Sequence, residues 1–107
     1  MSEEPVTSAS RDADTVTVAL HGEIDVLTVA QVRVALGEAI AARPRLIVVD
    51  MAELSFIDST GLGALIFGFQ RARDEGIGFR LARPSRGVHQ ILVLSGLLEV
   101  VEVTPGR

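Results

Sequence analysis

The sequence predicts a single α/β domain with a mixed, mostly parallel sheet of four to five strands covered by helices. Short apolar segments with the spacing of strands alternate along the chain with longer segments that have the spacing of helices. This alternation is typical of parallel strands joined by right-handed helical crossovers. The 107 residues are 48% hydrophobic but include only four Phe, with no Trp and no Tyr. That length permits one domain with its own core, and the composition indicates that the core is aliphatic.

Four segments have the pattern of strands. Residues 15–20 and 79–82 alternate in the way that half-buried strands do, and Pro84 stops the second of them. Residues 46–49 are an unbroken apolar run rich in β-branched residues, which fits a strand buried on both faces and ending at Asp50. Residues 100–103 are a short final strand. The domain is therefore expected over residues 15–103, with residues 1–14 as a flexible arm or weak edge strand and residues 104–107 as a tail.

Three segments have apolar residues at helical spacing. The first follows Thr28, which is placed for a capping box with Gln31, and Pro44 closes it. Its predicted buried stripe is Val29, Val32, Leu36 and Ile40. The second helix begins at or next to Ser59 and ends near Gly76. The third is capped by Ser85 and ends at Gly96, after which Leu97 is expected to pack back on the last turn.

Composition excludes several classes of function. The chain has no Cys, so disulfides, zinc–thiolate sites and cysteine nucleophiles are absent. All ten basic residues are Arg, and without Lys a phosphate-binding P-loop and Schiff-base catalysis are excluded. The net charge of −4 argues against a nucleic-acid partner. No apolar stretch reaches the length of a membrane span and the N-terminus has no signal pattern, so a cytoplasmic protein is expected.

The run Asp58-Ser59-Thr60-Gly61 presents a hydroxyl where a strand leads into a helix. Free backbone N–H groups and the helix dipole favour added negative charge at such a position. The sequence therefore predicts phosphorylation of Ser59, with Thr60 as the alternative acceptor. The plainer interpretation is that Asp58, Ser59 or Thr60 simply caps the helix.

The helix that follows contains several small residues, which are expected along the side away from its apolar stripe of Leu62, Leu65, Ile66 and Phe69. These small residues are Gly61, Gly63, Ala64 and Gly68. Because glycine costs helix stability, they indicate close approach by another protein. Phe67 is expected on the same side, either as a partner contact or as a second core contact.

The sequence contains single residues of two other kinds of site. Asp25, Asp50 and Asp58 are expected near the carboxyl ends of strands, where open parallel sheets bind ligands, so Asp50 is a candidate phosphate acceptor of the receiver type. Receiver domains also need a Lys, which this chain lacks. A serine hydrolase would need the elbow Gly-x-Ser-x-Gly, which is missing here. His21 and His89 are isolated, so neither a catalytic constellation nor a metal cluster is expected, and no enzyme activity.

Four motifs in matching order and spacing resemble the anti-sigma factor antagonists of the STAS domain family, over residues 15–103. They are Gly22-Glu23-Ile24-Asp25, Val48-Val49-Asp50-Met51, Phe56-Ile57-Asp58-Ser59-Thr60-Gly61-Leu62-Gly63 and Leu94-Ser95-Gly96-Leu97. Family members usually continue into another helix after the final strand, whereas this sequence stops at Arg107, so the packing of that edge is expected to differ.

The resemblance implies a function for the chain. A partner anti-sigma factor that is itself a serine kinase would phosphorylate Ser59. The unphosphorylated form would bind this kinase, displace its sigma factor and permit transcription, and a serine phosphatase would reset the switch. The expected partner-binding residues are Asp25, Asp58, Ser59, Thr60, Gly61, Gly63 and Phe67, with no cofactor and no metal. Because the family also contains modules that serve non-sigma partners, that role stays an alternative.

Overall fold

The structure is a computed structural model that describes residues 6–104. The arm expected over residues 1–14 and the tail expected over 104–107 therefore lie partly outside the described residues. The elements in chain order are β1 (Val6–Asp12), β2 (Thr15–Ile24), α1 (Val29–Ala41), β3 (Leu46–Ile57), α2 (Ser59–Asp74), β4 (Gly78–Ala82), α3 (Arg86–Ser95), the 3-10 turn η1 (Leu97–Glu99) and β5 (Glu102–Thr104).

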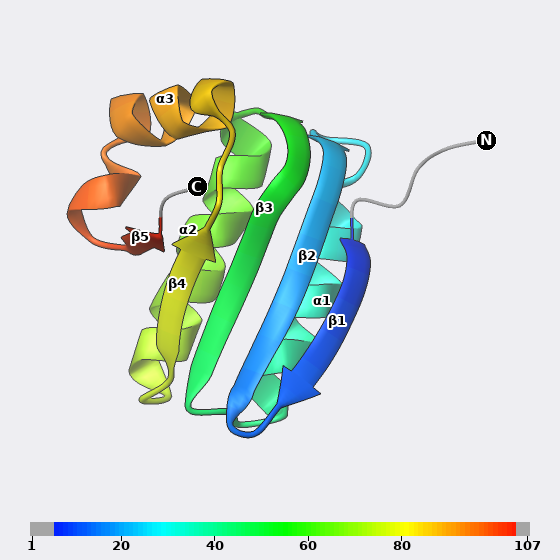
Figure 1. Cartoon of the computed structure of the whole chain (residues 1–107), viewed down its shortest axis with the longest axis vertical. Coiled ribbons are helices and arrows are strands. Elements are labelled where there is room, and N and C mark those ends of the chain that lie inside the picture. The colour runs from blue at the N-terminus through cyan, green and yellow to red at the C-terminus, as the bar shows by residue number, and fades with distance from the viewer. Residues whose placement is uncertain (1–5, 105–107) are drawn as a thin grey trace.

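The strands form one sheet in the order β1-β2-β3-β4-β5 (Figure 1). β1 pairs with β2 in the antiparallel direction, and each later pair is parallel. The predicted α/β domain with a mixed, mostly parallel sheet is confirmed. β2 and β3 end together at the pair Ile24 and Ile57, so the loops that follow these two strands start at one edge of the sheet, whereas β4 ends opposite Asp50.

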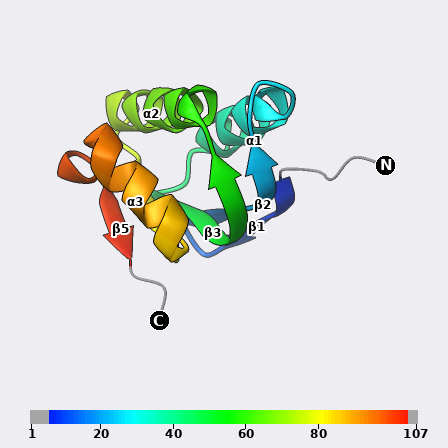
Figure 2. The ribbon, with the colours of Figure 1, turned by 90° about the horizontal axis from the view of Figure 1, so that it is seen from above.

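The helices are not spread evenly over the sheet. α1 and α2 lie side by side over one face, whereas α3 lies near the carboxyl end of β4 and contacts β3 (Figures 1 and 2). Alternate strand residues such as Val18, Ile47 and Leu81 are fully buried under the helices. Leu46 and Val48 point the other way and are only half-buried. The prediction that this apolar run is buried on both faces was wrong, because no described helix covers the second face of the sheet at that point.

β3 continues well beyond the predicted end at Asp50. Its pairing with β2 shifts register between Ala19 and His21 and again between Gly22 and Glu23, each time with one extra residue on β3. These bulges change the buried positions from every second residue to every third, at Met51, Leu54 and Ile57. The simple alternation that predicts strands is lost there, although the strand runs on to Ile57.

The predicted buried stripe of α1 and the predicted ends of α3 agree closely with the structure. The stripe Val29, Val32, Leu36 and Ile40 is buried in α1. The Ser85 hydroxyl accepts a hydrogen bond from the N–H of Val88 at 3.2 Å, as expected of an N-cap. Gly96 ends α3 in the left-handed region, with φ of 80°.

The chain after α3 differs from expectation. Leu97 is buried, as predicted, but it begins the turn η1. The final strand covers Glu102–Thr104 and not residues 100–103, and Val100 is exposed. Apolar character alone thus misplaced the last strand, because Val101 reaches the core from a connection and not from a strand.

Candidate functional site

Three neighbouring polar residues at the start of α2 have different roles. Asp58 is the N-cap, and its Oδ1 accepts a hydrogen bond from the N–H of Gly61 at 3.0 Å. Ser59 is the first residue of the helix and its side chain is exposed, while Thr60 is half-buried. Because Asp58 does the capping, the Ser59 hydroxyl is not needed for it and is open to solvent. The first N–H groups of a helix have no partner within the helix, so this position suits an anion.

The outward face of α2 runs from Ser59 through Gly63 to Phe67, at steps of one helical turn. Ser59 and Gly63 are exposed, and 51% of the surface of Phe67 is exposed to solvent. A Cβ on Gly63 would meet no atom within 4 Å, so there is open space above this glycine. The guanidinium of Arg71 lies 5.8 Å from the centre of the Phe67 ring. Phe67 is therefore a surface residue and not the second core contact that the sequence left open.

The other small residues of α2 face the interior. A Cβ on Gly61 would lie 2.6 Å from Cγ1 of Ile57, and one on Gly68 would lie 2.9 Å from Cδ1 of Leu36. Ala64 is buried as well. The prediction that these residues line the outward side was wrong for all three, because they allow α2 to pack closely on β3 and α1. Gly61 is thus buried in the packing of α2.

Asp25 lies in the turn between β2 and α1. Its Oδ1 accepts a hydrogen bond from the N–H of Leu27 at 2.9 Å, and its backbone oxygen accepts from the N–H of Val29 at 2.9 Å. The Thr28 hydroxyl accepts from the N–H of Asp25 at 3.0 Å and makes no side-chain cap for α1. The predicted capping box of Thr28 and Gln31 was therefore wrong. The Thr28 side chain closes the turn before the helix and does not cap the helix itself.

The turn and the start of α2 lie together at one edge of the sheet. Ile24 and Ile57 are partners in the β2–β3 ladder, and the N–H of Asp58 donates to the backbone oxygen of Ile24 at 3.2 Å. Asp25 and Asp58 follow these two strand ends directly. The structure thus brings together Asp25, Asp58, Ser59 and Thr60, as the sequence predicted.

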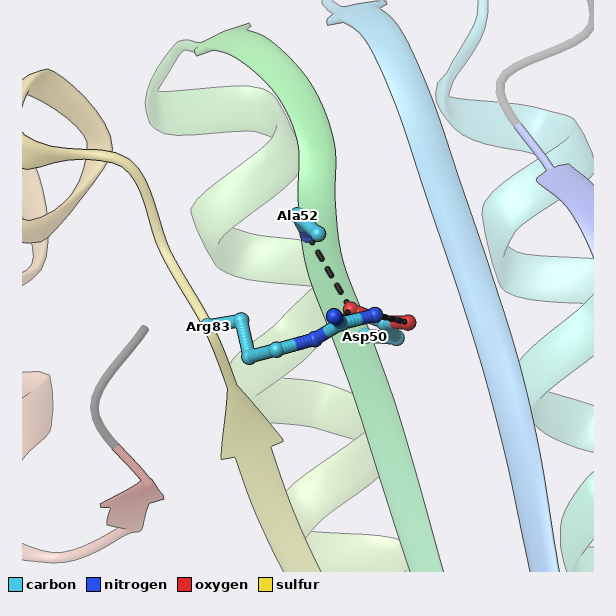
Figure 3. Close-up of polar contacts among 3 residues, drawn as sticks. All are labelled: Asp50, Ala52 and Arg83. Carbon is cyan, nitrogen blue, oxygen red and sulfur yellow. Dashed lines mark hydrogen bonds and ion pairs between the residues drawn. The ribbon is translucent and has the colours of Figure 1, made fainter. Parts of the chain in front are cut away.

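Asp50 does not belong to this group. It lies within β3, and the seven residues that follow it, up to Ile57, extend the strand on the order of 20 Å beyond it. Its carboxylate is bound instead by Arg83, with Nη2 to Oδ2 at 2.6 Å and Nε to Oδ1 at 3.2 Å (Figure 3). The N–H of Ala52 also donates to Oδ1, at 3.1 Å. The expectation that Asp50 lies near the carboxyl end of its own strand was wrong, because β3 continues to pair with β2 as far as Ile57.

The ion pair with Arg83 stabilises the ionised form of the Asp50 carboxyl group. Partial burial acts to raise the pKa of Asp50, but the hydrogen bonds from Arg83 and Ala52 and the charge of Arg83 outweigh it and hold that pKa below its ordinary value. The pKa of Arg83 is raised by the same contact. A carboxylate held in this way has a structural partner already, which does not favour its use as a phosphate acceptor.

The two histidines lie in different places: His21 lines a hollow together with Asp25 and Leu27 of the turn, whereas His89 lies away from the site on α3. Nδ1 of His21 is buried and has no hydrogen-bond partner within residues 6–104, and His89 lines a hollow beside Pro84 and Arg86 on α3. Among the described residues, no three His, Asp or Glu side chains are grouped so that they could hold a metal ion. None of the helices in residues 6–104 is long and apolar enough to cross a membrane.

The residues at the tip of the Asp25 turn were not among the predicted site residues. Val26 and Leu27 are 72% and 85% exposed. The available signal was two aliphatic residues between Asp25 and Thr28, outside any helical or strand period.

Comparison with known proteins defines the class of the chain. It belongs to the STAS domain family, whose model matches residues 7–106. It is 32% identical over 87 residues to the anti-sigma F factor antagonist of Paenibacillus polymyxa, covering 80% of this chain and 74% of that protein. It is 29% identical over 93 residues to the anti-sigma-B factor antagonist of Listeria monocytogenes, covering 87% and 82%.

Solved structures of antagonists share the fold. The anti-sigma factor antagonist SpoIIAA in its unphosphorylated form is 26% identical, with a TM-score of 0.77 over 91% of this chain and 86% of that one. The Bacillus cell fate determinant SpoIIAA in its phosphorylated form is 24% identical, with a TM-score of 0.70 over 91% and 89%.

Proposed function

We propose that this chain is an anti-sigma factor antagonist whose binding to a serine-kinase anti-sigma factor is switched by phosphorylation of Ser59. In this proposal the unphosphorylated chain binds the kinase and releases a sigma factor, and a serine phosphatase restores that form. The observation that carries it is the exposed Ser59 hydroxyl at the first position of α2, beside a separate N-cap, Asp58. The names of the relatives and the phosphorylated form of SpoIIAA support the same role.

The outward face of α2 supports a close protein contact. The open space above Gly63 lets a partner backbone approach α2, and the exposed ring of Phe67 is an aromatic anchor of the kind that dominates interface energy. We place the partner surface on Ser59, Gly63 and Phe67 together with the adjoining turn of Asp25. Asp58 contributes by holding the start of the helix, and Gly61 by letting α2 pack on Ile57 and Ile24.

Phosphorylation of Ser59 would act on this surface mainly through charge. The phosphate adds roughly −1.5 to −2 charges beside Asp58, on a chain whose net charge is already −4. Within a closely packed interface this dianion would be partly desolvated and without a cation, and burial of an unpaired charge is costly. In the free chain the same phosphate remains in water at a helix start, where the fold tolerates it. Binding is therefore lost while the fold stays the same.

The direct test is binding of wild type, Ser59→Ala and Ser59→Asp to each purified anti-sigma factor kinase of the same organism, with and without ATP. Wild type should bind and lose affinity as it is phosphorylated. Ser59→Ala should bind and keep its affinity in ATP, and Ser59→Asp should bind at least roughly tenfold more weakly than wild type. Equal affinity of Ser59→Asp and wild type would refute the switch.

Gly63 gives a second test with a matched control. Gly63→Leu places a bulky side chain on the proposed surface, and Gly87→Leu places one on α3 at another exposed helical glycine with open space. Both variants should fold, but only Gly63→Leu should weaken binding of the kinase. Equal binding by the two variants would mean that the partner docks elsewhere on the chain.

The same binding experiments distinguish two alternative functions, a STAS module for a non-sigma partner and a receiver-type site. A STAS module for a non-sigma partner would bind none of the anti-sigma factors. A receiver-type site would carry phosphate on Asp50, which Asp50→Asn would abolish and Ser59→Ala would not. The ion pair of Asp50 with Arg83 argues against that chemistry. We assign no catalytic activity to the chain and expect it to act in the cytoplasm as a substrate and switch.

A further inference from the structure

The turn between β2 and α1 exposes two aliphatic side chains at its tip. Val26 is 72% exposed and Leu27 is 85% exposed. Single exposed apolar residues are common on protein surfaces and need no explanation. Two in succession, at the most exposed point of a short turn, leave apolar surface in contact with water on both side chains.

The chain holds this turn in one conformation. The carboxylate of Asp25 accepts from the N–H of Leu27 at 2.9 Å, and the backbone oxygen of Asp25 accepts from the N–H groups of Thr28 and Val29 at 3.1 and 2.9 Å. The Thr28 hydroxyl accepts from the N–H of Asp25 at 3.0 Å and donates to the backbone oxygen of Glu23 at 3.0 Å. The apolar tip is thus preorganised, which lowers the entropy lost when it binds.

The tip adjoins the proposed phosphorylation site. The bond from the N–H of Asp58 to the backbone oxygen of Ile24, at 3.2 Å, joins the residue before the turn to the start of α2. Phe56, paired in register with Glu23 on the neighbouring strand, is also exposed. A protein that covers Ser59 would meet the tip on the same edge of the sheet.

We propose that Val26 and Leu27 enter an apolar pocket of the protein partner, and that Asp25 is a positioning residue which holds the turn in the form that presents them. This inference rests on the proposed function, because the partner is the anti-sigma factor that Ser59 controls. Glu23 and Asp25 line a hollow together with Leu27, and this negative charge disfavours an anionic membrane as the occupant.

The first test compares two leucines of equal exposure. Leu27→Ala and Leu94→Ala remove side chains that are 85% and 87% exposed, the second on α3. Both should melt as wild type does. Calorimetry with the purified anti-sigma factor kinase that binds wild type should show affinity at least roughly tenfold lower for Leu27→Ala and less than about twofold lower for Leu94→Ala. Equal effects of the two substitutions on kinase binding would overturn the inference. So would a Leu27→Ala variant that binds the kinase as wild type does but has lost self-association.

The second test separates positioning by Asp25 from a direct charge contact. Asp25→Asn keeps an oxygen that can accept from the N–H of Leu27, whereas Asp25→Ala removes it. Amide exchange at Leu27 should stay slow in the first variant and become fast in the second, and only the second should weaken binding. Equal loss of binding in both variants would mean that the charge itself contacts the partner. If wild type bound no anti-sigma factor, the proposed function would be wrong and this inference with it, whereas a Leu27→Ala variant that bound normally would refute the inference alone.

Discussion

Asp58 and Ser59 are neighbours with different roles at the start of α2. A carboxylate at the N-cap satisfies the N–H of Gly61 and also interacts favourably with the positive end of the helix dipole. The next residue is free of this role and exposed. A modification of Ser59 therefore leaves the cap of the helix in place, which a switch acting without refolding requires.

Alanine substitution of Asp58 and of Ser59 should have different effects on the stability of the fold. We expect Asp58→Ala to lower the free energy of unfolding by about 0.5–2 kcal/mol, because the N–H of Gly61 loses its partner. Ser59→Ala should change it by less than about 0.5 kcal/mol, as for an ordinary surface substitution. Urea unfolding of both variants measures this difference. A larger cost for Ser59→Ala than for Asp58→Ala would mean that Ser59 is the true cap.

The pair of Asp50 and Arg83 should make stability depend on pH. Since the folded-state pKa of Asp50 is lowered, its contribution is present above the ordinary value of about 3.9 and is lost as pH falls through the folded-state pKa. Asp50→Asn should therefore lower the melting temperature by a few °C at most near pH 7, since exposed ion pairs are weak. The difference from wild type should shrink below about pH 4. A difference that persisted unchanged at pH 2–3 would show that Asp50 does not act through its charge.

The two sides of α2 serve different contacts, although each carries glycine. On the inward side Gly61 lies against Ile57 and Ile24, and Gly68 lies against Leu36, so a side chain has no room. On the outward side Gly63 has open space. The glycine that lacks an internal packing reason is the one on the same face as Ser59 and Phe67.

Alanine substitution should have opposite effects on the two sides. Gly63→Ala should raise the free energy of unfolding by about 0.5–1 kcal/mol, because alanine favours the helix and meets no atom. Gly61→Ala should lower it by about 1–3 kcal/mol, because the new Cβ would lie 2.6 Å from Ile57 Cγ1. Thermal unfolding of both variants tests the assignment of faces. Stabilisation by Gly61→Ala would contradict the packing described here.

At the scale of elements, the order of strands and helices follows from the sequence wherever the hydrophobic period is regular. The stripe of α1 and the ends of α3 were predictable for that reason. The second half of β3 was not, because two bulges remove the alternation between Asp50 and Ile57. The capping box at Thr28 failed for a different reason. Its hydroxyl bonds to the backbone N–H of Asp25, a contact that depends on the turn geometry and not on helix spacing.

The candidate site was predicted in part. Ser59, Asp58 and Asp25 follow the ends of neighbouring parallel strands, so the fold class itself brings them to one edge. The inward-facing glycines of α2 were not predicted. Their position depends on how closely α2 packs on Leu36 and Ile57, which the hydrophobic period of the helix does not indicate. The role of Val26 and Leu27 depends on their exposure, which becomes visible only when the turn is placed.

For the whole molecule, the arrangement favours a switch by charge on a constant fold. The sheet and the helices α1 and α2 share one core of aliphatic side chains, and the site lies outside that core at the carboxyl edge. A phosphate on the exposed Ser59 changes the net charge from −4 to roughly −6. We therefore expect the phosphorylated and unphosphorylated chains to differ in partner affinity and not in fold.

The central claim is that Ser59 is the residue that carries the switch. Mass spectrometry of the chain purified from its own host, with fragmentation that assigns the modified residue, measures this most directly. Our account predicts a phosphorylated fraction with phosphate on Ser59, which treatment with a serine phosphatase removes and Ser59→Ala abolishes. Phosphate on Asp50, on Thr60 or on any other residue in place of Ser59 would contradict it.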